Sequence, residues 1–388
     1  MGILKRFGLL PRIIVAIALG IGSGLVMPAW GIRLFLTFNG IFSQLLGFAV
    51  PLIIIGMVIP AISELGRNAG RMLLLTVALA YGATLAAGVI SYLTGSLTFP
   101  SLISQQIDAG TIAEGVKLTP YFSLTIPPLM DVMTALVTAF LFGLGIAYIE
   151  GNVLRRAAVE FQSVITKFIE NLLIPLLPIY IYGIFLDMTA AGEVGQILMV
   201  FIKIIGIIFL LHILWLIGLY IVAGTIGNKN PLKMLTTMMP AYFTALGTQS
   251  SAATIPVTLR QTQKMGVSDD VAGFVVPLCA TIHLSGSMLK IVACALALMI
   301  MQGQEYDIMQ FVGFICMLGI TMVAAPGVPG GAIMAALGVL GSMLGFTTDD
   351  QALMISLYVA MDSFGTACNV TGDGALAVIV DKIKSKIG

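Results

Sequence analysis

The chain has 388 residues, of which 59% are hydrophobic and 10% are charged, and its formal net charge is +1. A soluble domain carries about 25% charged residues, so this composition excludes a soluble globular protein and indicates a polytopic membrane protein. The sequence has no basic cluster with interleaved aromatic residues, which removes nucleic acid as a partner. Its four cysteines form no CxxC or Cys/His pattern of a metal site or disulfide framework.

Six apolar segments of membrane-spanning length come first, near residues 9–27, 35–62, 70–96, 120–149, 161–187 and 195–225. The first continues to Met27 without a small-residue cleavage site, so we interpret it as a retained helix and not as a signal peptide. Residues 231–265 are semi-polar. Residues 270–302 and 308–346 are apolar, but polar, Gly and Pro residues interrupt them at 281–287 and 324–331.

These interruptions distinguish the C-terminal part from the regular N-terminal helices. Non-helical backbone at membrane depth is tolerated only where protein or a water-filled cavity covers it. Hydrophobic segments broken by Gly or Pro at corresponding places are the best sequence indication of a transporter's binding site. Two hairpin-like segments that flank a broken helix therefore predict two inverted halves around a solute site.

The charges predict the orientation. Lys and Arg gather at the N-terminus, at alternate connections and at the C-terminus, whereas the intervening connections carry mostly Asp and Glu. The positive-inside rule then places both termini in the cytoplasm, which requires an even number of spans. We expect an all-α polytopic protein of the plasma (cytoplasmic, inner) membrane. It would have eight transmembrane helices and two re-entrant helical hairpins, at about 231–265 and 308–346.

The last apolar segment carries a polar stripe formed by Asp362, Thr366, Asn369 and Asp373. At 100° per residue these positions fall within about 60° of one another on a helix. A polar packing face between helices needs only one or two Asn or Thr residues. Two carboxylates inside a bilayer are costly and face a bundle interior or a cavity, so the full stripe favours a solute or ion site.

Four C-terminal motifs, in this order, resemble the dicarboxylate/amino acid:cation symporters, which include the glutamate and neutral amino acid transporters. They lie at 248–260, 276–287, 327–330 and 369–373, whereas residues 1–225 resemble the family mainly in helix layout. The resemblance implies an inverted-repeat elevator fold and a homotrimer. Residues 1–69 and 97–194 would form the scaffold, and residues 70–96 and 195–388 the mobile transport domain.

The resemblance also implies residue roles. Asp362 and Thr366 would hold the α-amino group of an amino acid, and Asn369 and Ser251 its α-carboxylate, which agrees with the hydrogen-bonding capacity of these side chains. The hydroxyls of the first hairpin tip could instead only satisfy a turn. The other predicted substrate-binding positions are Gln249, Ser250, Ser287, Val328, Ala332 and Gly365.

Two positions indicate a neutral substrate. Members that carry acidic substrates have an Arg at one of the positions that are Gly365 and Gln249 here. A buried distal carboxylate without a cation would cost several kcal/mol, as a rough estimate. Gly365 would open space for a neutral side chain of small to medium size. The alternative is an acidic substrate that uses Lys290 as its cationic partner.

The cation sites of the family are altered. The resemblance assigns candidate sodium ligands to Asn369, Asp373, Thr281, Cys279, Tyr81 and Thr84, but His283, Ser285 and Leu85 replace three family ligands. Imidazole is a poor ligand for a hard cation. The coupling ion, Na⁺ and/or H⁺, therefore stays open, with His283, Lys290 and Asp373 as charge or proton candidates; no other cofactor is expected. The alternatives are purely structural: a neutral His283 that is hydrogen-bonded across helices, and a Lys290 that snorkels to an interface.

We therefore predict a secondary active transporter for neutral L-amino acids in a lipid bilayer, and not an enzyme. An intramembrane aspartyl protease needs its two carboxylates about 3 Å apart, but Asp362 and Asp373 would lie about 16 Å apart along one helix. A channel would show charge rings or filter motifs, and neither is present. An uncoupled facilitator or exchanger of the same fold remains an alternative.

Overall fold

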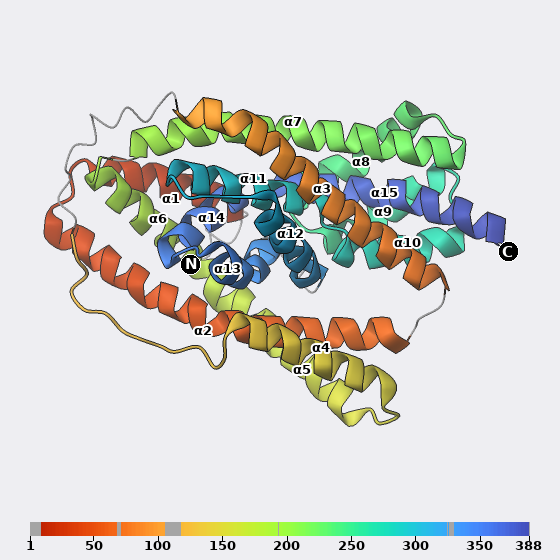
Figure 1. Cartoon of the computed structure of the whole chain (residues 1–388), viewed down its shortest axis with the longest axis horizontal. Helices are drawn as coiled ribbons and strands as arrows, with labels where there is room; N and C mark the ends of the chain where they lie inside the picture. Colours follow the sequence, from red (N-terminus) through yellow and green to blue (C-terminus); the bar gives the residue numbers. More distant parts are fainter. Residues whose placement is uncertain are drawn as a thin grey trace.

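The computed structural model describes residues 9–67, 71–104, 118–192, 194–323, 325 and 330–387, and every regular element within them is a helix (Figure 1). In chain order these are α1 (Leu9–Gly24), α2 (Ala29–Arg67), α3 (Arg71–Ser104), α4 (Val132–Tyr148), α5 (Val153–Phe168), the π-helical turn η2 (Ile169–Leu173), α6 (Ile174–Ala190), α7 (Val194–Gly227), α8 (Pro231–Thr248), α9 (Ser251–Lys264), α10 (Asp269–Ile282), α11 (Ser285–Met301), α12 (Ile308–Val323), α13 (Gly331–Leu344), α14 (Thr348–Ala360) and α15 (Asp362–Ile387).

Five helical stretches in the described ranges are long and apolar enough to cross a membrane, and the bent α14–α15 pair makes a sixth. These five are Ala29–Ser63, Met72–Ile103, Val153–Ala190, Leu198–Gly227 and Asp269–Met301. The helices α1, α4, α12 and α13 are apolar but shorter. Helices satisfy their own backbone polar groups, which is what a chain of this hydropathy requires inside lipid.

The helix breaks lie where the polar, Gly and Pro residues interrupt the apolar pattern. Between α8 and α9, Gln249 adopts a left-handed conformation with φ of 54°. The Ser250 hydroxyl then accepts a hydrogen bond from the Ala253 N–H at 3.3 Å and caps α9. The helices α8 and α9 pack against each other, and so do α12 and α13, so the two interrupted segments form helical hairpins.

Two details differ from the sequence prediction. The expected span at 120–149 contains an extended stretch up to residue 131, because Pro127 and Pro128 oppose a helix there, and α4 begins only after Asp131 caps it. The last segment is not one straight helix, since α14 and α15 meet at an angle of 63°. Met361, the residue at this bend, donates its N–H to Tyr358 O, a tight i→i−3 bond that ends α14.

The C-terminal helices surround α15, the helix that carries the polar stripe. Helix α15 packs against α7, α8, α9, α10 and α11, and α11 also packs along α3. Every residue of α11 from Ser285 to Met299 is buried. On the other side of the molecule α2 packs against α4 and α5 (Figure 1). Burying a polar group in a helix as enclosed as α11 is costly unless the group is hydrogen-bonded. Ser287 and Lys290 are bonded to other helices and help to define the site, whereas Ser285 Oγ has no partner among the described residues.

Candidate functional site

Helices α11 and α15 approach closely where both are lined by small residues. The Gly286 N–H donates to Asn369 Oδ1 at 2.7 Å. A Cβ at Gly286 would lie 2.6 Å from Gly365 O and 2.7 Å from Cys368 Cβ, so only glycine allows this distance between the helices. Contacts pair later residues of α11 with earlier residues of α15, so the two helices run antiparallel. This register decides which side chains meet.

The first pair that this register creates is Lys290 with Asp362. Lys290 Nζ donates to Asp362 Oδ1 at 3.0 Å, and the two side chains are 0% and 4% exposed. The ammonium also lies 3.5 Å from the centre of the Tyr358 ring, in a cation–π contact. Lys290 is therefore a buried ion-pair partner, and the alternative that it snorkels to an interface is wrong.

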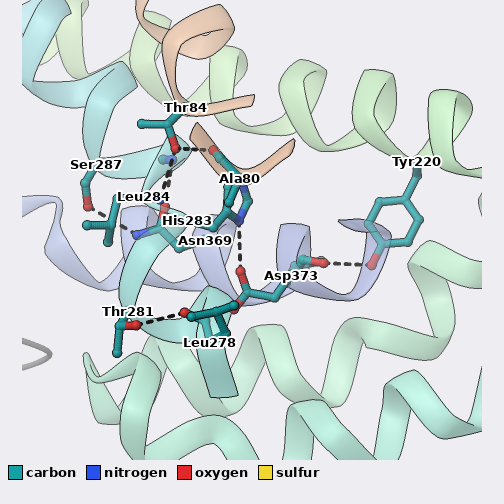
Figure 2. Close-up of polar contacts among 12 residues, drawn as sticks. Ala80, Thr84, Tyr220, Leu278, Thr281, His283, Leu284, Ser287, Asn369 and Asp373 are labelled. Carbon is teal, nitrogen blue, oxygen red and sulfur yellow. Dashed lines mark hydrogen bonds and ion pairs between the residues drawn. The ribbon is translucent and has the colours of Figure 1, made fainter. Parts of the chain in front are cut away.

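The second pair is His283 with Asp373, seen in Figure 2 at the break between α10 and α11. His283 Nδ1 and Asp373 Oδ1 are 2.8 Å apart, and the side chains are 0% and 1% exposed. Next to them the Tyr220 hydroxyl donates to Thr371 O at 2.8 Å. The imidazole is thus bonded across helices to the aspartate that was a candidate cation ligand.

Two glycines of α15 provide the recesses for these basic side chains. A Cβ at Gly365 would lie 2.6 Å from Lys290 Cε and 2.7 Å from Lys290 Nζ. A Cβ at Gly372 would lie 2.6 Å from His283 Cε1. The sequence prediction that Gly365 leaves free space for a substrate side chain is therefore wrong in this structure, because the end of Lys290 fills that space.

Between the hairpins and α15 lies a polar cavity of about 30 Å³. Both hairpin tips are bonded to the first residues of α15. Gln249 Nε2 donates to Ser363 Oγ at 2.8 Å, and the Gly330 N–H donates to Asp362 Oδ2 at 2.8 Å. Since a ligand pocket measures about 300–1,000 Å³, this cavity is too small to hold a solute unless a tip moves. A larger cavity of about 160 Å³, between α2 and α12, is apolar and lacks these groups.

The structure brings most of the predicted substrate-binding residues to this one cavity, which is also lined by Tyr358, Thr281, Ala280, Leu284 and Ala325. The predicted residues in its wall are Gln249, Ser251, Ser287, Ala332, Asp362, Thr366 and Asn369. Ser250 acts as the cap of α9. Val328 lies outside the described residues.

Hydrogen bonds link three of the cavity groups into one network. Asn369 Nδ2 donates to Ser287 Oγ at 3.2 Å, and Ser287 Oγ is 2.9 Å from the Tyr358 hydroxyl. Tyr358 thereby connects the ammonium of Lys290 to the amide of Asn369. A network whose members are all bonded holds its side chains in one arrangement, which is what recognition of a small solute requires.

The candidate cation ligands are less closely grouped than the predicted substrate-binding residues. Thr84 Oγ1 donates to Ala80 O and accepts from the Leu284 N–H at 3.3 Å, so it lies at the α10–α11 break (Figure 2). The Thr281 hydroxyl donates to Leu278 O. Tyr81 donates to Cys316 O at 3.0 Å, on the side of α3 that faces α12. Cys279 is buried.

Sequence reasoning missed Tyr358 and Ser363 as parts of the site. Ser363 follows Asp362 directly, and Tyr358 lies four residues before Asp362, across the bend at Met361, so proximity in sequence was a usable signal. His212 Nε2 lies 2.9 Å from Gly286 O and helps to hold α7 against α11.

The positions of the two aspartates test the alternative of an intramembrane aspartyl protease. Asp362 and Asp373 lie on the uninterrupted helix α15, and each is bonded to a basic side chain of its own. Two carboxylates can share a proton only when they lie about 3 Å apart. The aspartates therefore do not form a catalytic dyad.

Known proteins resemble this chain in sequence over nearly its whole length. Residues 9–383 match the sequence model of the sodium:dicarboxylate symporter family. The chain belongs to this family. It is accordingly a membrane-embedded transport protein and not an enzyme, and the resemblance seen in the four C-terminal motifs is confirmed.

Individual relatives match to different extents. The serine/threonine transporter SstT of Acinetobacter baumannii (strain ATCC 17978) is 26% identical over 395 residues, which cover 97% of each chain. Excitatory amino acid transporter 2 of Homo sapiens is 33% identical over 156 residues, 40% of this chain and 27% of that protein. Excitatory amino acid transporter 4 of Mus musculus is 28% identical over 180 residues, 44% of this chain and 32% of that protein.

Proposed function

We propose that this symporter-family protein carries neutral L-amino acids by alternating access at the cavity between its two hairpin tips and α15. The observation that carries the proposal is the closure of both tips on α15, by Gln249 on Ser363 and by Gly330 on Asp362. Opening either tip would expose the same polar groups to a different side. Alternating access requires one site that two segments can open separately, and here each hairpin tip has its own bond to α15.

The cavity offers complementary groups for the two ends of an amino acid. The N-termini of α9 and α13 adjoin it at Ser251 and Ala332, and helix N-termini stabilise a carboxylate. Asn369 adds an amide, and Asp362 supplies an anion for the α-amino group. These side chains support the substrate roles that the family resemblance implies.

The placement of Lys290 favours a neutral over an acidic side chain. Its ammonium contacts Asp362 and Tyr358 in the recess beside Gly365, and Lys290 does not line the cavity. A distal carboxylate in the cavity would therefore meet no unpaired cation, which opposes an acidic substrate. SstT, which matches over 97% of its length, is named for serine and threonine, two small neutral amino acids, and this also supports the proposal.

Coupling to Na⁺ and/or H⁺ is part of the proposal. Family membership supports sodium as a co-substrate. The bond between His283 and Asp373 occupies one oxygen of a candidate sodium ligand, and an imidazole can carry a proton. The two ions are distinguished by uptake into sealed vesicles under separate sodium and proton gradients, and uptake that ignores both would favour the facilitator or exchanger alternative.

We further propose eight spans, two re-entrant hairpins, cytoplasmic termini and a homotrimer. Counting the short helices α1 and α4 and the bent α14–α15 pair with the five long stretches gives eight spans. The core cluster that joins α3, α7, α8, α10 and α15 supports a transport domain, and α11 to α14 connect it to the helices packed around α2 through a second cluster. An elevator motion would move the transport domain relative to the helices around α2.

Three measurements test the proposed function. Uptake of a panel of labelled amino acids by the reconstituted protein should favour small neutral L-amino acids, and potent competition by L-aspartate would refute the assignment. Native mass measurement in mild detergent should give a trimer. Asp362→Asn should reduce amino-acid affinity by about tenfold or more, since it removes the counter-charge of the ammonium.

A further inference from the structure

The ion pair of Lys290 with Asp362 has a consequence for the chemical class of the substrate. The Lys290 ammonium is 0% exposed, fits the recess beside Gly365 and lies over the Tyr358 ring. None of these contacts involves a hairpin tip. The pair therefore persists when a tip opens, and a ligand meets Asp362 with its charge already balanced.

Asp362 keeps one oxygen for a ligand when the second hairpin opens. In the closed structure Oδ1 accepts from Lys290 Nζ, and Oδ2 accepts from the Gly330 N–H. Movement of Gly330 with its hairpin would leave Oδ2 as an acceptor without adding an unpaired charge. A neutral hydroxyl, like an ammonium, can donate a hydrogen bond to this oxygen.

The charges of Lys290 and Asp362 determine how much a ligand ammonium contributes to the binding free energy. With an amino acid bound, two ammonium groups would share the single carboxylate of Asp362, and like charges close together repel. With a hydroxyl in place of the amino group, Lys290 balances Asp362. The ligand carboxylate still meets the N-termini of α9 and α13 and the donors Ser251 and Asn369.

We propose that Lys290 takes the place of the substrate's α-ammonium as the partner of Asp362, so that the transporter also accepts 2-hydroxy acids whose side chains match those of its amino acids. The proposal rests on the proposed function, because it concerns the same cavity. It makes Lys290 a specificity-determining residue that acts through Asp362 without touching the ligand.

The wild-type protein provides the first test. Binding to the full chain in mild detergent is measured for L-alanine against L-lactate and for L-serine against L-glycerate, at fixed sodium and pH. The inference expects the two members of each pair to bind with affinities within about fivefold of each other. Amino acids that bind while their hydroxy acids are about a hundredfold weaker would overturn the inference and leave the proposed function intact.

The other wild-type outcomes are also decisive. Binding of the hydroxy acids alone would support the inference and overturn the amino-acid assignment. Binding of neither class would overturn both. Because no variant is needed, these results hold even if changes in the buried pair prevent folding.

Variants test the role of Lys290 itself. In Lys290→Met, Asp362 again needs a cation from the ligand, so the ratio of amino-acid to hydroxy-acid affinity should rise by about tenfold or more. In Asp362→Asn, the unbalanced Lys290 ammonium should repel amino acids while hydroxy acids continue to bind. Lys203→Met, on the exposed face of α7, is the matched control and should leave the ratio unchanged. An unchanged ratio in Lys290→Met would contradict the assigned role.

Discussion

Removing the charges of Lys290 and Asp362 one at a time and together should reveal a strong coupling between them. Lys290→Met keeps most of the side-chain length but leaves the Asp362 carboxylate, with 4% exposure, without its cation. Removal of one partner of a buried ion pair costs about 3–5 kcal/mol, because the remaining charge stays desolvated. Asp362→Asn should lower the stability by a similar amount, because it leaves the Lys290 ammonium buried without its anion.

The double variant Lys290→Met/Asp362→Asn should be more stable than either single variant. It leaves no unpaired charge, and the main loss is the cation–π contact with Tyr358 at 3.5 Å, about 2 kcal/mol in a desolvated site. We expect its stability to lie within about 2 kcal/mol of the wild type, whereas the two single losses together amount to at least about 6 kcal/mol, so the coupling between the two positions is at least about 4 kcal/mol.

Buried thiols provide the assay. Cys279, Cys294 and Cys368 are buried and become reactive to a fluorogenic thiol reagent when the protein unfolds on heating. The background from the exposed Cys316 is common to all variants. The expected order of unfolding temperatures is wild type, then the double variant, then the two single variants. Additive losses, with the double variant least stable, would refute the ion pair, and Lys203→Met should unfold like the wild type.

Two glycine substitutions test the packing of α15. Gly286→Ala should destabilise the protein by about 1–3 kcal/mol, because its Cβ would overlap α15, whereas Gly82→Ala, with nothing within 4 Å, should be neutral or stabilising by about 0.5–1 kcal/mol in the same thiol assay. Equal unfolding temperatures for these two variants would contradict the close approach of α11 and α15. Gly372→Ala should displace the His283 ring from Asp373 and lower the initial rate of uptake by about tenfold or more, as expected when a site group moves by about 1 Å, and unaltered uptake would mean that this pair has no role in transport.

Much of the site was predictable because its signals are local. Helical spacing alone placed Asp362, Thr366 and Asn369 on one face of α15, and the structure brings all three to the same cavity. The helix break at 281–287 also followed from local sequence, since Gly and polar residues interrupt an apolar run there. The bend at Met361 had no such signal, because neither Gly nor Pro marks it.

The sequence by itself determined the membrane class, the helical hairpins, the polar stripe and the family, since each depends on composition or on residues close together in the chain. Only the tertiary structure decided the partners of the two aspartates. Lys290 and Asp362 are 72 positions apart, and His283 and Asp373 are 90 positions apart. Their pairing depends on the antiparallel register of α11 and α15, which the contact at Gly286 fixes. A local pattern carries no information about that register, so Gly365 looked like open space until the structure placed a lysine there.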